Sequence, residues 1–264
     1  MITAEAAIHR ARRDLALGLL LKGALAAALV LCLVISPQGA RLVLFSMVVF
    51  VWLVLKFASA RGSRLAALSP PLIASGQFEE AERQIGEAVR AFSVFRAVKM
   101  QALQCLAQLR HAQRRWPDSA MLCRAVLGQR RGRARQLEKP CRLILADALL
   151  EMNEVGGAWE AMSALYAQRL SLSEVLNLML VQLDYSSRVG AWQQMVDQIA
   201  TKVQLAELMP AHQSARAQAL LALAARRVGR EDWALWLRRR VELIADVQLL
   251  CSERPLVSEL WKND

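Results

Sequence analysis

Histidine, cysteine and acidic residues build most metal and catalytic sites, and in this chain their spacing matches none of the common ones. The histidines are His9, His111 and His212, and none stands in an HExxH motif or at metal-ligand spacing from a cysteine. No GxxxxGK(S/T), GxGxxG or GxSxG motif is present. The sequence therefore predicts no catalytic residue, no metal site and no cofactor, and it favours a non-enzymatic protein that acts by binding.

The cysteines also argue against covalent chemistry. They are odd in number and form no CxxC pair, and most lie within apolar helical patterns. We expect buried free thiols in a reducing compartment. The residues are Cys32, Cys105, Cys123, Cys141 and Cys251.

An apolar region at residues 15–60, interrupted only at 36–41, organises the chain. As a helix, residues 15–35 are long enough to cross the ~30 Å hydrocarbon core of a bilayer, and residues 42–60 are just long enough. Each span must satisfy its backbone hydrogen bonds internally, so we expect an antiparallel transmembrane helical hairpin. A cleaved signal peptide is the alternative, but the first run is longer than a typical signal core and a second follows at once.

Basic residues flank the hairpin on the side of its two ends, whereas the turn carries a single arginine. By the positive-inside rule both termini and the soluble domain are cytoplasmic, which predicts a multi-pass protein of the inner (plasma) membrane. Lys22, within the first span, either snorkels to the interface or meets a headgroup or partner. Gly23 and Ala27 have the small-xxx-small spacing that lets another helix approach. The flanking and turn residues are Arg10, Arg12, Arg13, Arg41, Lys56, Arg61 and Arg64.

Beyond the hairpin the apolar residues recur at intervals of three and four, which predicts helices throughout and an all-α fold. Four segments open with glycine, at Gly76, Gly156, Gly190 and Gly229, and a fifth copy surrounds Trp116. A small or flexible residue follows at a shared position, such as Ala81, Ser119, Ala161 or Ala234. Two helices in each period of about 33 to 42 residues indicate an α-solenoid.

Two of these segments resemble the tetratricopeptide repeat. GQFEEAERQIGEAV, which begins at Gly76, resembles the second half of that motif, and ALLALAARRVGREDWA, which ends at Ala234, resembles the junction of its helices. The resemblance covers about residues 72–250 and implies an inner groove that receives an extended peptide or a partner helix. Pro70 and Pro71 depart from the motif. A two-span hairpin followed by such an array, with RVGAWQQMVDQIATKV, is also similar to the HemY family of membrane proteins, which are associated with haem-biosynthesis clusters.

The resemblance implies that the first helix of each pair lines the inner groove with polar side chains, which suit hydrogen bonding to a peptide backbone; an ordinary solvated helix face is the alternative. On either reading these side chains are exposed, so charge reversal at Asp147, Glu151 and Asp184 is expected to weaken binding of a basic partner segment without changing stability. The candidates are Gln101, Gln104, Gln108, His111, Asp147, Glu151, Asn177, Asp184, Arg188 and Arg216.

The formal net charge is +11, and part of the excess is local. A short basic stretch precedes and includes residue 139 with only Glu138 opposing it, and such a stretch binds anionic headgroups or forms a solvated loop between helices. These membrane-surface candidates are Arg130, Arg131, Arg133, Arg135 and Lys139.

Aromatic and basic residues elsewhere favour packing over nucleic-acid binding. Trp116, Trp159, Trp192 and Trp233 recur at the repeat period beside the inter-helix turns, which is typical of core packing rather than of a stacking ladder for bases or a porphyrin. The arginine triplet at 238–240 is typical of a solvated helix face. No nucleic-acid partner is expected.

The sequence thus predicts a basic cytoplasmic N-terminus at 1–14, a transmembrane hairpin at 15–60, a repeat domain at 62–250 and a tail at 251–264. The expected function is that of a membrane-anchored adaptor or scaffold, with a protein partner and the lipid bilayer as its contacts. The alternative is an accessory subunit or assembly factor of a larger membrane complex, which it contacts through the hairpin.

Overall fold

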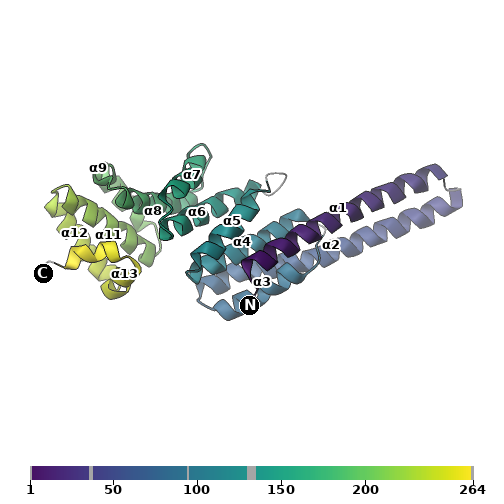
Figure 1. Ribbon diagram of the computed structural model, residues 1–264, viewed down its shortest axis with the longest axis horizontal. Coiled ribbons are helices and arrows are strands. Elements are labelled where there is room, and N and C mark those ends of the chain that lie inside the picture. The colour runs from purple at the N-terminus through teal and green to yellow at the C-terminus, as the bar shows by residue number, and fades with distance from the viewer. Residues whose placement is uncertain (1, 36–37, 94, 130–134, 263–264) are drawn as a thin grey trace. The chain divides into compact units, whose positions relative to one another are not determined.

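A computed structural model describes residues 2–35, 38–93, 95–129 and 135–262 (Figure 1). The side chains of 31–35, 38–42, 44, 61, 135 and 136 lie outside this description. The described residues form helices and no strand, which confirms the all-α prediction. Contacts divide the chain into two compact units, Met1–Ala148 and Leu149–Asp264.

The first unit contains two long helices that pair side by side and shorter helices that pack against one end of this pair (Figure 1). Its helix α6 continues into the second unit. The elements are α1 (Ala4–Ile35), α2 (Gln38–Ala74), α3 (Phe78–Arg90), α4 (Arg96–Ala112), α5 (Trp116–Leu127) and α6 (Arg135–Glu151).

The predicted N-terminal segment 1–14 is part of this bundle. Ala4, Ala7 and Ala11 are buried, and their spacing of three and four residues places them on one face of α1. Asp14, one turn further, is buried and its Oδ2 lies 2.6 Å from Nζ of Lys99 on α4. The start of α1 is therefore a core element that an ion pair fastens to α4.

The middle of the helix pair, by contrast, is exposed and apolar. Leu19, Leu20 and Phe57 have exposed fractions of 74%, 68% and 75%. Among the described residues, one segment, Phe45–Ala74, is long and apolar enough to cross a membrane. Residues 36 and 37 of the expected turn lie outside the described part.

The second unit is built around α11, whose alanine-rich surface lets neighbouring helices approach closely. Residues 215, 217, 219, 222, 224 and 225 are buried alanines on this helix. The predicted tail at 251–264 includes a helical segment that packs on α11, with Leu250, Val257 and Leu260 buried in the same core. The elements are α7 (Val155–Tyr166), α8 (Leu172–Arg188), α9 (Trp192–Val196), α10 (Ile199–Glu207), α11 (Ala211–Arg227), α12 (Glu231–Ile244), α13 (Val247–Glu253) and η2 (Pro255–Trp261).

One turn geometry recurs in both units, two residues before α3, α5, α7, α9 and α12. Each turn has a residue with positive φ, and the next residue donates its N–H to the carbonyl five positions earlier, which is the longer bond of a Schellman cap. The five positive-φ residues follow one another at 38, 39, 37 and 39 residues. They are Gly76, Arg114, Asn153, Gly190 and Gly229.

This turn corrects the expected repeat register. The third copy turns at Asn153, with φ of 60°, and not at Gly156. Asparagine tolerates the left-handed region, so glycine spacing alone was misleading. The small residue five positions on is therefore Ala158, fully buried, in place of Ala161, and it corresponds to Ala81 and Ala234.

Candidate partner-binding cavity

The expected groove residues of the first unit lie on α4 and α6. Gln101, Gln104 and Gln108 are half-buried on α4. His111 Nε2 lies 2.8 Å from Oδ2 of Asp147, and its ring meets Trp116 edge to face at 4.9 Å. His111 and Asp147 were expected to face a peptide groove. They pair with each other instead, so this part of the expected polar face is not open to a ligand.

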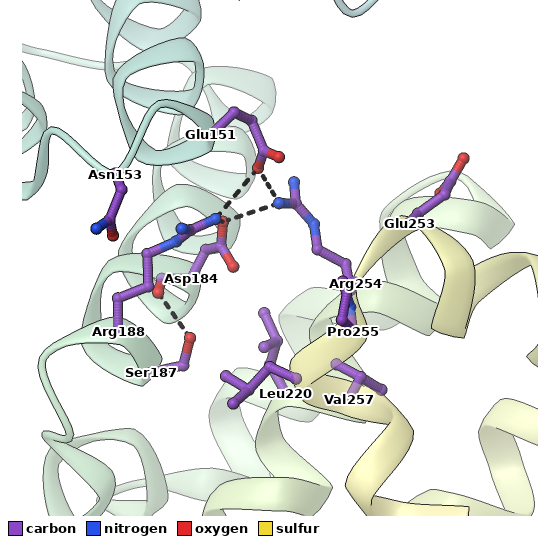
Figure 2. Close-up of a pocket in the computed structure, with 11 residues that line it drawn as sticks. Glu151, Asn153, Asp184, Ser187, Arg188, Leu220, Glu253, Arg254, Pro255 and Val257 are labelled. Carbon is purple, nitrogen blue, oxygen red and sulfur yellow. Dashed lines mark hydrogen bonds and ion pairs between the residues drawn. The ribbon is translucent and has the colours of Figure 1, made fainter.

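In the second unit, Asp184 on α8 forms the centre of an ion-pair cluster (Figure 2). Its Oδ2 lies 3.0 Å from a guanidinium nitrogen of Arg216, 3.4 Å from one of Arg254 and 3.8 Å from one of Arg188. The Asp184 carboxylate is therefore shared by three guanidinium groups.

Glu151 supplies a second carboxylate to the same cluster. Its Oε1 lies 3.4 Å from Arg188 and also pairs with Arg254 (Figure 2). Each member of the cluster comes from a different part of the unit: Glu151 from the end of α6, Arg216 from α11, and Arg254 from the connection of α13 to η2. Asp184 and Arg188 are one turn apart on α8, so both face the same side.

A cavity of about 360 Å³ adjoins this cluster. Its polar wall carries carboxylate, guanidinium and amide groups, and its other wall is aliphatic. Such a mixture suits a ligand that has both backbone hydrogen-bonding groups and an apolar part. The lining residues are Glu151, Asn153, Asp184, Ser187, Arg188, Leu220, Glu253, Arg254, Pro255, Leu256 and Val257.

The expectation that these carboxylates are exposed is wrong for two of them. Asp147 and Asp184 are buried, with exposed fractions of 9% and 3%, whereas a solvated groove was expected. Reversing a buried, paired charge leaves its partners uncompensated, so such changes cost stability. The guanidinium groups of the same chain also neutralise Glu151 and Asp184, so these carboxylates give no reason to expect a basic partner segment.

Arg254 is the cluster member that sequence reasoning missed, because residues 251–264 were expected to form a tail. The spacing of Leu250, Val257 and Leu260 was the available signal, since apolar residues at intervals of seven and three indicate a helical face. These residues pack on the α11 core and so carry Arg254 to the cavity.

The remaining candidates lie elsewhere. Asn177 is exposed on α8 and does not line the cavity. Lys139 is half-buried on α6, which begins at Arg135. The membrane-surface candidates Arg130, Arg131 and Arg133 lie outside the described residues.

The tryptophans make several kinds of contact. Trp159 is 46% exposed and stacks on Tyr185 at 5.4 Å between ring centres, and Trp233 meets Trp236 edge to face at the same distance. Trp192 packs against the core of the second unit. The expected packing role therefore fits Trp192 better than Trp159.

Three thiols of the first unit are buried and carry no disulfide: Cys105, Cys123 and Cys141. Burial raises the pKa of Cys105. A hydrogen bond with Cys141, together with burial, raises the pKa of Cys123 well above its ordinary value. A raised pKa disfavours the thiolate, so these two thiols are poor nucleophiles. Cys32 lies outside the described side chains.

Comparison of the chain with models of protein families, with curated proteins and with solved structures gives no match. The cavity and the exposed helix pair are therefore the basis for a functional proposal.

Proposed function

We propose that this protein is a membrane-anchored scaffold of the tetratricopeptide type, which binds a protein partner at the cytoplasmic face of the inner membrane and catalyses no reaction. The cavity of the second unit carries this proposal. Four of the residues expected to line a peptide groove, Glu151, Asp184, Arg188 and Arg216, belong to one cluster beside it. The recurring turn supports the repeat class, and the exposed apolar middle of α1 and α2 supports the anchor.

The proposed ligand is a peptide segment of the partner. Glu151 and Arg188 are partly exposed at the cavity, so their carboxylate and guanidinium groups can meet backbone N–H and C=O groups. The aliphatic wall at Leu220, Leu256 and Val257 would contact an apolar side chain of that segment. The cluster holds three guanidinium groups and two carboxylates, and binding of a peptide backbone leaves this charge unchanged, because the backbone carries no net charge.

Affinity purification of the full chain in mild detergent, followed by mass spectrometry, would identify the partner and test the cavity. Arg188→Glu reverses a cavity charge, while Asp184 retains Arg216 and Arg254. Arg239→Glu is the matched control, on the exposed face of α12. We expect the first variant to lose the partner and the second to retain it. Loss in both, or in neither, would contradict the proposal.

The second candidate is an accessory subunit that contacts a larger complex through the hairpin. Gly23 favours it, because a Cβ at this position would meet no atom within 4 Å and the helix face there is open. Gly23→Leu adds bulk without a clash inside the chain. If this variant loses the complex and Arg188→Glu does not, the hairpin is the contact.

A further inference from the structure

The connection between α3 and α4 lies against the middle of the helix pair. Phe95, the last residue of this connection, meets Trp52 of α2 edge to face at 5.9 Å between ring centres. The Nζ of Lys22 on α1 lies 5.5 Å from the centre of the same Phe95 ring. Through Phe95 the connection thus contacts residues of both long helices that lie beyond Asp14 and Ser59, where the helices enter the bundle.

The burial pattern shows where an apolar slab would begin. Among the described residues of α1, Asp14 is the last buried polar side chain, with the exposed charges of Arg12 and Arg13 beside it, and on α2 burial begins at Ser59. Between these levels and the far ends of the helices lie about 20 residues of each helix, which span ~30 Å and match a hydrocarbon core. The level of Asp14 and Ser59 is therefore the bundle-side edge of the apolar region.

The contact with Phe95 lies inside this region. Trp52 is six residues from Ala58 and Lys22 is seven from Leu15, so the contact lies about 10 Å beyond the edge. Exposed apolar side chains, Leu19, Leu20 and Phe57, occupy the interval. A boundary drawn at Trp52 instead would leave them in water and would shorten each limb to about 20 Å, too short to cross.

Several polar groups of the connection have partners within the unit, which lowers the cost of a lipid environment. Lys99 Nζ donates to the carbonyls of Val89 and Ala91 at 2.8 and 2.6 Å. Ser93 is buried, and its Oγ accepts from the N–H of Phe95 at 3.2 Å. Phe92, in contrast, is 39% exposed.

From these contacts we propose that Phe92 and Phe95 enter the bilayer beside the hairpin, so that the described part of the α3–α4 connection is a second lipid contact. The Lys22 side chain would extend along α1 toward the interface, because side chains lean toward the N-terminus of their helix, and its ammonium would rest on the Phe95 ring on the way. This inference rests on the membrane anchor of the proposed function, and the experiment separates the two.

Photo-crosslinking of the purified full chain in vesicles of phosphatidylethanolamine and phosphatidylglycerol tests the proposal. The cross-linking residue p-benzoylphenylalanine replaces Phe92, Phe57 or Phe78, one at a time. Phe57 reports the hairpin, and Phe78, at the opposite end of α3, is the matched control. We expect lipid adducts at Phe92 and Phe57 and none at Phe78.

The other outcomes are distinct. Adducts at Phe57 alone overturn the second contact and leave the anchor standing, whereas adducts at neither position overturn the anchor as well. Adducts at all three positions, or chain-to-chain products at Phe92, show a different contact and overturn the proposal.

Protection of an introduced thiol also tests whether residue 92 lies in the bilayer, and cysteine is a smaller replacement than the cross-linking residue. In a chain carrying Cys251→Ser, the thiol of Phe92→Cys should react slowly with an impermeant maleimide in vesicles, and that of Ser75→Cys, an exposed position, should react quickly. Equal rates would overturn the proposal.

Discussion

Asp14 in the first unit and Asp184 in the second are both buried carboxylates paired with basic side chains, yet their surroundings differ. Lys99 uses its three N–H groups on Asp14 and on the carbonyls of Val89 and Ala91, and its exposed fraction is 1%. Asp184 is shared by three guanidinium groups, each with five N–H donors, at the wall of a cavity. In the Asp14 pair every N–H group of the lysine is used inside the core. In the Asp184 cluster some guanidinium N–H groups remain available to a ligand in the cavity.

The largest loss of stability is expected at the buried Asp14–Lys99 pair. Lys99→Met leaves Asp14 buried without its counter-charge, so we expect a loss of about 3–5 kcal/mol in unfolding free energy, measured by denaturant unfolding in detergent. The double change Asp14→Leu and Lys99→Met should recover most of it, since an apolar pair leaves no buried charge. Wild-type stability of Lys99→Met alone would show that the pair does not fasten α1.

A smaller loss is expected at the cavity. Asp184→Asn should cost about 1–3 kcal/mol, because its three guanidinium partners lose a charged acceptor but retain access to water through the cavity. Asn177→Asp, on the exposed part of the same helix, is the control and should change stability by no more than ~0.5 kcal/mol. If Asp184→Asn costs as much as Lys99→Met, the two clusters are alike and the comparison fails.

The repeat position is where the two units should behave alike. Ala81→Leu in the first and Ala158→Leu or Ala234→Leu in the second overfill the same helix contact, so each should cost about 1–3 kcal/mol. Thermal unfolding followed by circular dichroism would compare them. Ala211→Leu, at an exposed position on α11, should be near neutral. Unequal losses in the two units would disprove the shared register.

The smallest effect concerns the buried thiols of the first unit. Because the pKa of Cys123 is raised in the folded chain, its contribution is complete below the ordinary thiol pKa of about 9 and is lost as pH rises above it. We expect urea midpoints to fall more between pH ~7 and ~10 in the wild type than in Cys123→Ala. Parallel curves would mean that this thiol ionises without cost.

The helical content followed from local sequence, but the register of the third repeat did not. Spacing of three and four residues predicts helices because one face must be buried, and this holds from Phe78 to Ile244. The turn at Asn153 was missed because the left-handed conformation is stabilised by a cap bond from Glu154 to Leu149, which any tolerant residue satisfies. Glycine is the commonest residue there, but it is not required.

The sequence by itself determined an all-helical chain with a long apolar segment near its start and polar residues on the first helices of its pairs. Only the tertiary structure decided which of those polar residues are buried and with what. Asp14 meets Lys99, and Glu151 meets Arg254, across 85 and 103 residues, so no local period encodes these pairs. Helix periodicity indicates which face of a helix a side chain occupies. A buried charge is costly unless it is paired, and its partner comes from a helix that is distant in the sequence. The pairing is therefore determined only when those helices pack.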